Sequence, residues 1–285
     1  MRKIILIIAF FFSSLGIAQN NSKSLLWKIS ENGLSKPSYI YGTIHITCDA
    51  TLPQKVKTAL DKTEQLCLEL DMDDPNMQSE MMTMFMMKDG LTMRKLVSEE
   101  DFKIVDAFLT SNLGFSAEMI NTMKPFMITA MLYPKMLNCE MQSVETELMK
   151  IASEQKEDVI GLETIKFQMD VFDQIPYQDQ MNELVKTAKS DLKRDKNEIN
   201  EMFALYKTED IEAIFNFSKK SDNVITSKFG EIMLDNRNQN WISKIGNIAK
   251  IKPTFFGVGA AHLGGEMGVI NLLIKAGYSV EPVLK

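Results

Sequence analysis

The sequence contains only two histidines, and each one ends a four-residue Gly-x-x-His motif. The first motif runs from Gly42 to His45 and the second from Gly259 to His262. Imidazole is the side chain best suited to metal ligation and to proton transfer near neutral pH. A single histidine near a strand is most often a structural residue, but two matched motifs that hold every histidine favour a site. Each motif follows a short, apolar, β-rich run, so both imidazoles are expected just past the carboxyl end of a strand, where open α/β sheets form their sites.

Two acidic residues lie in or directly after further strand-like runs. Glu69 lies in the apolar run 66–71, where a charge without a partner would be buried at high cost. A metal, a histidine or an arginine would serve as that partner, and the end of this strand is expected at the same sheet edge as His45. Glu163 follows the run 158–162 in the same way. It could equally be an acid at a helix N-terminus that accepts from free backbone amides.

A cationic candidate lies late in the chain. Arg237 and Asn238 fall in a predicted helix that otherwise has an apolar stripe. An arginine in that place could clamp a carboxylate or stabilise a developing oxyanion. It could also be a surface residue.

The elements that must position these residues follow from hydrophobic periodicity and from turn signals. Strands are predicted over 25–30, 38–42, 66–71, 158–162, 254–258 and 279–284. The Asn-Gly pair at 32–33 predicts a hairpin between the first two strands. Helices are predicted from Pro53 to about residue 62, and over 98–112, 117–132, 143–155, 178–206, 209–218, 221–248 and 265–276.

Both ends of the chain follow the order strand, Gly-x-x-His, helix, strand. This order predicts two βαβ units, which cross over right-handed and belong to a parallel sheet. We therefore expect an α/β (α+β) fold with a mixed, mostly parallel central sheet from two βαβ units and a large helical insertion. Residues 19–285 are predicted to form a single domain, with sheet units at about 25–71, 158–163 and 252–285 and the insertion at about 72–250. Side-by-side packing of the two units would bring the histidines together.

The first 18 residues have the pattern of a secretory signal peptide. Arg2 and Lys3 precede an apolar run, and small residues follow at a cleavage-like position. The run is too short for a stable membrane span, and no later stretch approaches membrane length. The mature chain is therefore expected to be soluble and either secreted or periplasmic.

Charge limits the class of partner. The net charge of −6 becomes −8 when the signal and its two basic residues are removed. Phosphate binding needs a clustered basic face, and no such cluster is visible, so a nucleic-acid partner is not expected. A peptide or another small substrate is the expected partner.

Three cysteines leave one over after any single disulfide. Cys67 lies inside a predicted strand, as a small buried apolar residue would, whereas Cys48 and Cys139 lie in loop-like contexts. Export permits a bridge, and these contexts favour Cys48 with Cys139. Three free thiols are the open alternative, because sequence does not supply the Cβ geometry.

Eight methionines fall between Met72 and Met93. Flexible thioethers suit adaptable apolar surfaces, so this segment could line a groove for an apolar substrate. Ordinary helix packing is the alternative and is favoured.

Taken together, these residues resemble the TraB/GumN family, which includes the Tiki metalloproteases and is distantly similar to the erythromycin-esterase and ChaN-like superfamily. The matching segments run in family order over nearly all of residues 25–285. They are 41–45, 68–71, 161–164 with Gln168, Arg237 with Asn238, 257–265 and 277–280.

The resemblance implies a mixed α/β fold with a helical insert, and an exported, divalent-metal-dependent hydrolase similar to the Tiki peptidases. The metal would be manganese or cobalt, or else zinc, held by His45, Glu69 and His262. Glu163 would act as general base and Arg237 would steady the oxyanion. Two alternatives stay open: a metal-independent, esterase-like hydrolase in which Glu69 orients His45 as the base, and a non-catalytic protein that binds or inhibits a peptide or ligand on the same scaffold.

Overall fold

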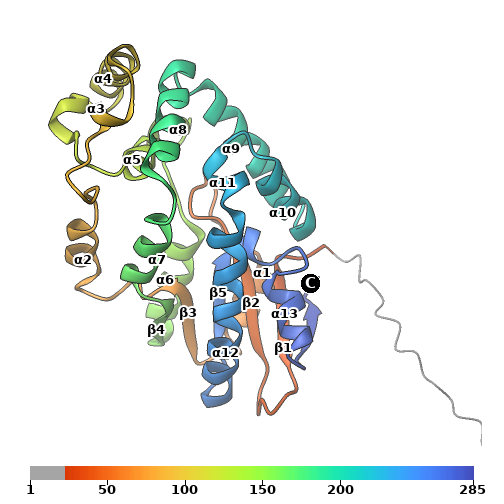
Figure 1. Cartoon of the computed structure of the whole chain (residues 1–285). Coiled ribbons are helices and arrows are strands. Elements are labelled where there is room, and N and C mark those ends of the chain that lie inside the picture. The colour runs from red at the N-terminus through yellow and green to blue at the C-terminus, as the bar shows by residue number, and fades with distance from the viewer. Residues whose placement is uncertain (1–22) are drawn as a thin grey trace, which may run out of the picture.

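A six-stranded sheet of order β4-β3-β5-β2-β1-β6 forms the base of the computed structural model, which describes residues 23–285 (Figure 1). The predicted signal peptide lies outside the described residues. The strands are β1 (Leu26–Ser30), β2 (Ser38–Thr43), β3 (Gln65–Leu70), β4 (Asp158–Glu163), β5 (Phe255–Gly259) and β6 (Ser279–Pro282). Each begins and ends within two residues of its predicted limits.

The sheet is mixed and mostly parallel, as predicted. β5 pairs in parallel with both β2 and β3, and β3 pairs in parallel with β4. β1 is antiparallel to β2, through the predicted hairpin, and also to β6. β6 therefore runs in the same direction as β2, and β1 alone runs against the other strands.

The two strands that carry the Gly-x-x-His motifs are neighbours. In the pairing of β2 with β5, Gly42 lies opposite Val258 and Thr43 lies opposite Gly259. The carboxyl ends of the two strands are thus level with each other. Every residue of β2 is buried, as expected for a central strand covered on both faces.

The remaining elements are helical and fall mainly between β3 and β5. They are α1 (Gln54–Leu60), α2 (Met77–Thr83), α3 (Met93–Leu96), α4 (Glu99–Leu113), η1 (Ala117–Ile120), α5 (Pro125–Met136), α6 (Val144–Gln155), α7 (Ile165–Phe172), α8 (Tyr177–Ser190), α9 (Lys193–Tyr206), α10 (Ile211–Lys220), α11 (Val224–Lys228), η2 (Glu231–Asp235), α12 (Asn236–Ile251), η3 (Ala260–His262) and α13 (Val269–Lys275). None of the helices in residues 23–285 is both long and apolar enough to cross a membrane.

The prediction of one helix over 117–132 was wrong. A 3₁₀ turn, η1, ends at Ile120, and α5 begins separately at Pro125. Proline disfavours helical backbone in the residue before it and is well suited to the first turn of a helix. The break is therefore placed by Pro125.

The predicted helices over 178–206 and 221–248 are also each divided. Asp191 and Leu192 adopt positive φ angles of 49° and 63°, which end α8 and start α9. Leu192 is buried in the core of the insertion, so tertiary packing stabilises a turn that helix propensity does not favour. In the second region α11 is followed by a π-helical turn, η2, which leads directly into α12.

Two apolar cores exist in the described chain. The larger one is built on the sheet and the helices that cover it. The smaller one joins α3, α4, α5 and α8, which Figure 1 shows grouped away from the sheet. Met87 and Met93 of the methionine-rich segment are buried in this second core, whereas Met82 is 62 % exposed. Packing in a core thus accounts for part of the methionine cluster.

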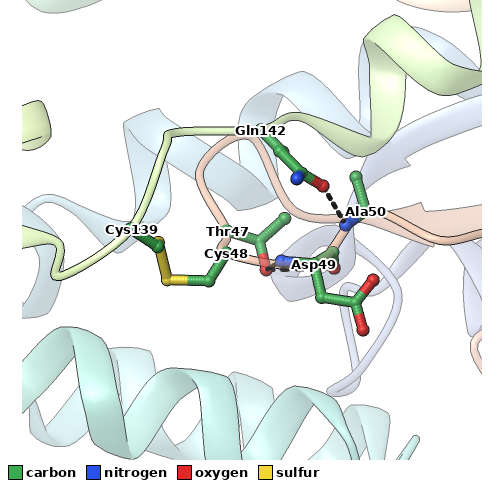
Figure 2. Close-up of a disulfide and its surroundings, with 6 residues drawn as sticks. All are labelled: Thr47, Cys48, Asp49, Ala50, Cys139 and Gln142. Carbon is green, nitrogen blue, oxygen red and sulfur yellow. Dashed lines mark hydrogen bonds between the residues drawn. A yellow bond between two sulfur atoms is a disulfide. The ribbon is translucent and has the colours of Figure 1, made fainter.

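The predicted disulfide between Cys48 and Cys139 is present, and Cys67 is a buried free thiol. Figure 2 shows the bridge joining the loop after β2 to the segment that leads into α6. Backbone hydrogen bonds in both directions between Thr47 and Gln142 lie beside it. The bridge therefore ties the insertion to the loop that carries the first histidine.

Candidate active site

The two imidazoles lie together beside Gly259, the last residue of β5. A Cβ built on Gly259 would lie 3.6 Å from His45 Nε2, 3.6 Å from His262 Cδ2 and 3.3 Å from Glu69 Oε1. A side chain on this residue would therefore occupy the space between the three groups. The predicted convergence of the two motifs with Glu69 is found in the structure, because β3, β5 and β2 are adjacent and end on the same edge.

His45 is oriented by a residue that the sequence did not point to. Its Nδ1 lies 2.6 Å from Oε1 of Glu145, a buried carboxylate in the first turn of α6. Desolvation opposes protonation of the imidazole, but the negative charge of Glu145, helped by Glu69, outweighs it and raises the pKa of His45 to about 9. The imidazole side chain is 63 % exposed, and its Nε2 faces the Gly259 side.

His262 differs from His45 in its burial and in the direction of its pKa shift. It is buried in η3, and its Nδ1 lies 2.6 Å from Oδ1 of Asn238. The amide nitrogen of Asn238 donates to the carbonyls of His262 and Met267, so its oxygen faces the ring and Nδ1 must carry the hydrogen. Burial lowers the pKa of His262 to about 3. The ring is therefore neutral, and the lone pair of Nε2 points toward Arg237 and Glu69.

Arg237 connects the acidic residues of the site. Its Nη2 donates to Glu69 Oε2 at 2.5 Å and to Glu163 Oε2 at 2.7 Å, and its Nε donates to both Glu163 oxygens. Its Nη1 lies 3.3 Å from His262 Nε2. The arginine is 7 % exposed and lies on α12 directly after the π turn, with its guanidinium over the ring of Trp241.

Glu69 stays ionised in this setting. Burial acts to raise the pKa of this carboxyl, but its charged surroundings hold it well below the usual range. Because His262 is neutral, the positive charges that keep Glu69 ionised are the guanidinium of Arg237 and the protonated imidazole of His45. The backbone N–H of Gly259 donates to Oε1 at 2.8 Å and adds to the stabilisation of the anion.

Glu163 lies behind Arg237. Besides the guanidinium, its oxygens accept from Trp241 Nε1 at 2.8 Å and Gln168 Nε2 at 3.2 Å. The side chain is 1 % exposed, and it does not belong to the lining of the cavity described next. The general-base role expected for Glu163 needs contact with water or substrate. The geometry supports instead a role in fixing Arg237.

A cavity of about 520 Å³ opens above these groups. His45, Glu69, Arg237 and His262 lie in its lining, together with apolar side chains from α5, α7 and α9 of the insertion. No methionine of the 72–93 segment lies in the lining of this cavity. Methionines from α5, α9 and the π turn do, namely Met136, Met202 and Met233.

A comparison with protein-family models matches residues 25–282 to the TraB/PrgY/gumN family. The chain belongs to this family. The match spans both Gly-x-x-His motifs and every strand, so the matched residues include all those of the site described above.

One curated relative of this TraB/PrgY/gumN chain is the metalloprotease TIKI2 of Danio rerio. It is 24 % identical over 117 residues, which cover 40 % of this chain and 21 % of the relative. The match thus spans about a fifth of the relative's length. No solved structure matches the chain.

Sequence reasoning missed two contacts of the site. Glu145 gave no signal, because it is an acid near a helix N-terminus and such acids are common. Tyr206, at the end of α9, donates from its hydroxyl to the carbonyl of Gly42 at 2.8 Å and so supports the first motif from the insertion. The other predicted residues, with Gln168 and Asn238, are all in contact with at least one member of the site.

Proposed function

We propose that this TraB/PrgY/gumN protein is an exported, divalent-metal-dependent hydrolase, most simply a peptidase. The observation that carries the proposal is the pair of imidazoles that lie together with Glu69 beside Gly259, each with Nδ1 held by a buried acceptor. Metal-binding histidines have this arrangement, in which a second partner fixes the tautomer and the ring orientation. The likeness to a metalloprotease supports the choice of reaction.

The donor types fit a divalent transition metal. His45, His262 and Glu69 would supply two imidazole nitrogens and one carboxylate oxygen and leave coordination positions for water and substrate. As the side chains stand, no three His, Cys, Asp or Glu residues within 23–285 are gathered closely enough to hold an ion. His262 Nε2 is 3.8 Å from Glu69 Oε1, and Arg237 occupies the other oxygen of Glu69. Manganese or cobalt is the proposed ion, with zinc as the other choice.

When bound, such a metal lowers the pKa of a coordinated water and polarises a carbonyl. The protein's own residues do the rest. Glu145 and Asn238 hold the two rings in place, and the cavity walls exclude bulk water. Arg237 presents fixed positive charge where an oxyanion would develop, and such preorganised charge stabilises the transition state. Glu163 and Trp241 keep the guanidinium in that position.

The test is metal analysis of the purified mature protein, followed by digestion of a peptide library with and without chelator. We expect about one equivalent of manganese, cobalt or zinc, and cleavage that chelation abolishes and added metal restores. His45→Ala and His262→Ala should each lower cleavage by at least about 100-fold and reduce metal binding. A protein that binds none of these metals and is unaffected by chelator would contradict the proposal.

A metal-independent hydrolase is the second candidate, and one observation favours it. Arg237 already neutralises Glu69, while His45 has a buried carboxylate partner of its own in Glu145. In this version His45 moves the proton, oriented by Glu145 rather than by Glu69. Cleavage that survives chelation but is lost in His45→Ala would select it. Peptide binding without turnover, unchanged in both alanine variants, would select a binding protein instead.

Export is part of the proposal and is supported by the disulfide. Cysteine pairs persist in oxidising compartments and are rare in the cytosol of most organisms. Fractionation of cells that produce the full-length chain should find the mature protein in the periplasm or the medium. A chain of full length that stays in the cytosol would contradict this part.

A further inference from the structure

Helix α9 lines the cavity with a single face. Asp195, Glu198, Ile199, Met202 and Tyr206 all belong to the lining, and their spacing of three or four residues places them on one side of the helix. Tyr206 lies at the catalytic end, where it bonds to Gly42. With a rise of 1.5 Å per residue, Asp195 lies about 16 Å away along the helix. The lining is therefore apolar in its middle and acidic at the end far from the histidines.

The acidic end holds more carboxylates than cations. Asp195 is 7 % exposed, and its Oδ1 accepts from Thr187 Oγ1 at 2.9 Å and Arg194 Nη2 at 3.0 Å. Its Oδ2 is buried and has no hydrogen-bond partner within the described residues. Arg194 is shared with a second buried carboxylate, Glu183. Lys186 is a second cation beside Glu183, so Arg194 and Lys186 together serve three carboxylates, Glu183, Asp195 and Glu198.

Glu198, one turn further along α9, has no cationic partner among residues 23–285. The hydroxyl of Ser221 donates to it. Burial raises its pKa, and the hydrogen bond from Ser221 and the charge of Arg194 offset that rise only in part. Burial, together with the charges of Asp195 and Glu198, also raises the pKa of Tyr133, which lines the cavity from α5. The negative charges of Asp195 and Glu198 therefore affect groups that line the cavity.

We propose that the Asp195 and Glu198 end of the cavity binds a positively charged group of the substrate, an ammonium or a guanidinium. A buried carboxylate oxygen without a donor is costly, and a cationic donor would satisfy it. The wall formed by Ile199 and Met202 would contact an apolar stretch between that group and the reacting bond. At about 3.4 Å per residue, 16 Å corresponds to about five residues of extended peptide.

The preferred substrate is therefore a peptide with an amine or guanidinium about five residues from the cleaved bond and apolar side chains between. This substrate class rests on the proposed function, whereas the binding of a cation to the cavity does not. The two statements can fail separately.

Binding is tested without turnover, by thermal unfolding of the mature protein with n-hexylamine, n-hexanol or n-hexanoate. The three probes share an apolar chain and differ in charge. We expect the amine to raise the midpoint temperature most and the carboxylate least. Asp195→Asn, which keeps the acceptor for Thr187 and Arg194, should reduce the amine's effect to that of the alcohol. Glu198→Gln should weaken it.

Glu201→Gln is the matched control, since it removes one negative charge from an exposed position of the same helix. It should leave the amine's advantage unchanged. Equal shifts for all three probes, or an amine effect that Asp195→Asn does not alter, would overturn the inference. The amine effect should persist in His45→Ala, so a failure to find hydrolysis leaves this result intact.

Peptides provide the second arm. A set with one lysine placed two to six residues from a fixed apolar sequence is compared with the same set carrying norleucine. Cleavage of the best lysine peptide should exceed its norleucine match by about 10- to 100-fold in kcat/KM, and the gap should close in Asp195→Asn. Cleavage with no lysine preference would leave the hydrolase in place and reject the cation site.

Discussion

At the scale of single residues, the imidazoles of the two Gly-x-x-His motifs differ in protonation state. Both imidazoles use Nδ1 for a buried partner and turn the rest of the ring toward Gly259. The partner of His45 is the carboxylate of Glu145, which raises the pKa of that imidazole to about 9. The partner of His262 is the neutral amide of Asn238, and burial lowers the pKa of this imidazole to about 3. The chain can thus present one charged and one neutral imidazole at the same place. The residue in contact with Nδ1, and not the Gly-x-x-His motif, sets the protonation state of each imidazole.

Glu145 is predicted to be a positioning residue for His45. Glu145→Gln removes the charge that holds the ring, and second partners of this kind are worth about 10- to 100-fold in metal affinity or activity. We expect a loss of that size in the cleavage rate, accompanied by weaker manganese binding in calorimetry and an unchanged circular dichroism spectrum. Glu154→Gln, an exposed position on the same helix, should behave as wild type. A variant with full activity and full metal affinity would remove Glu145 from the site.

The buried ion pair of Lys124 with Asp173, outside the site, predicts how the stability of the fold depends on pH. Lys124 is 1 % exposed and lies 2.6 Å from Asp173, which also contacts Lys88 at 2.8 Å. Burial acts to raise the pKa of Asp173, but the hydrogen bonds from both lysines and Tyr177 outweigh it and place the pKa below its ordinary 3.8. This carboxylate therefore stabilises the fold fully above pH 3.8, and the contribution is lost as the pH falls through the native pKa.

Asp173→Asn should accordingly lower the free energy of unfolding at pH 7 by about 3 to 5 kcal/mol, since it leaves Lys124 buried without an anion. Urea titrations of both proteins should show the difference shrinking below pH 4. Asp170→Asn, whose side chain is 48 % exposed, should change stability by less than about 0.5 kcal/mol. A difference that stays constant down to pH 3 would contradict the account.

At the scale of elements, the sequence predicts the strands well and the ends of the helices poorly. Strands follow from apolar, β-rich runs between turn signals, and such runs set the sheet edge on which His45, Glu69 and His262 meet. The break between α8 and α9 depends on the burial of Leu192, a contact that no local pattern reports. The contact of His45 with Glu145 is equally hidden, because it forms between segments that the sequence separates by the whole of α2 to α5.

The loop after β5 is predicted to tolerate no side chain at Gly264. A Cβ there would lie 2.4 Å from the carbonyl oxygen of Ile211 and 3.1 Å from the Cβ of Phe215, so α10 would have to move. Gly264→Ala should cost about 1 to 3 kcal/mol of stability, as overpacking does. Gly230→Ala is the control, with no atom within 4 Å of its added methyl group and negative φ. Chemical unfolding that ranks the two variants equally would show that the loop and α10 are not tightly packed.

At the scale of the whole molecule, the site depends on how the helical insertion is attached to the sheet. The strands supply Glu69 and Glu163, and the segments that follow β2 and β5 supply the histidines, while Glu145 and Tyr206 come from the insertion. The connections that bring the two parts together near His45 include the Tyr206 hydroxyl on Gly42, the backbone bonds of Thr47 with Gln142 and of Val144 with Ile44, and the disulfide. The bridge lies three residues from His45 and six from Glu145, so it constrains both members of that pair.

The double variant Cys48→Ser with Cys139→Ser should therefore lower stability by about 2 to 5 kcal/mol, the usual loss for a native bridge, because the unfolded chain regains the freedom of a long loop. Thermal unfolding of the mature protein with and without dithiothreitol gives an internal control. Reductant should bring the wild type down to the level of the variant and leave the variant unchanged, since Cys67 is buried and unpaired in the described structure. The same variant should lose manganese affinity if the bridge positions His45 beside Glu145. Metal affinity that stays at the wild-type level in a folded double variant would mean that the hydrogen bonds between the two segments, such as those of Thr47 with Gln142 and of Val144 with Ile44, suffice to hold the pair.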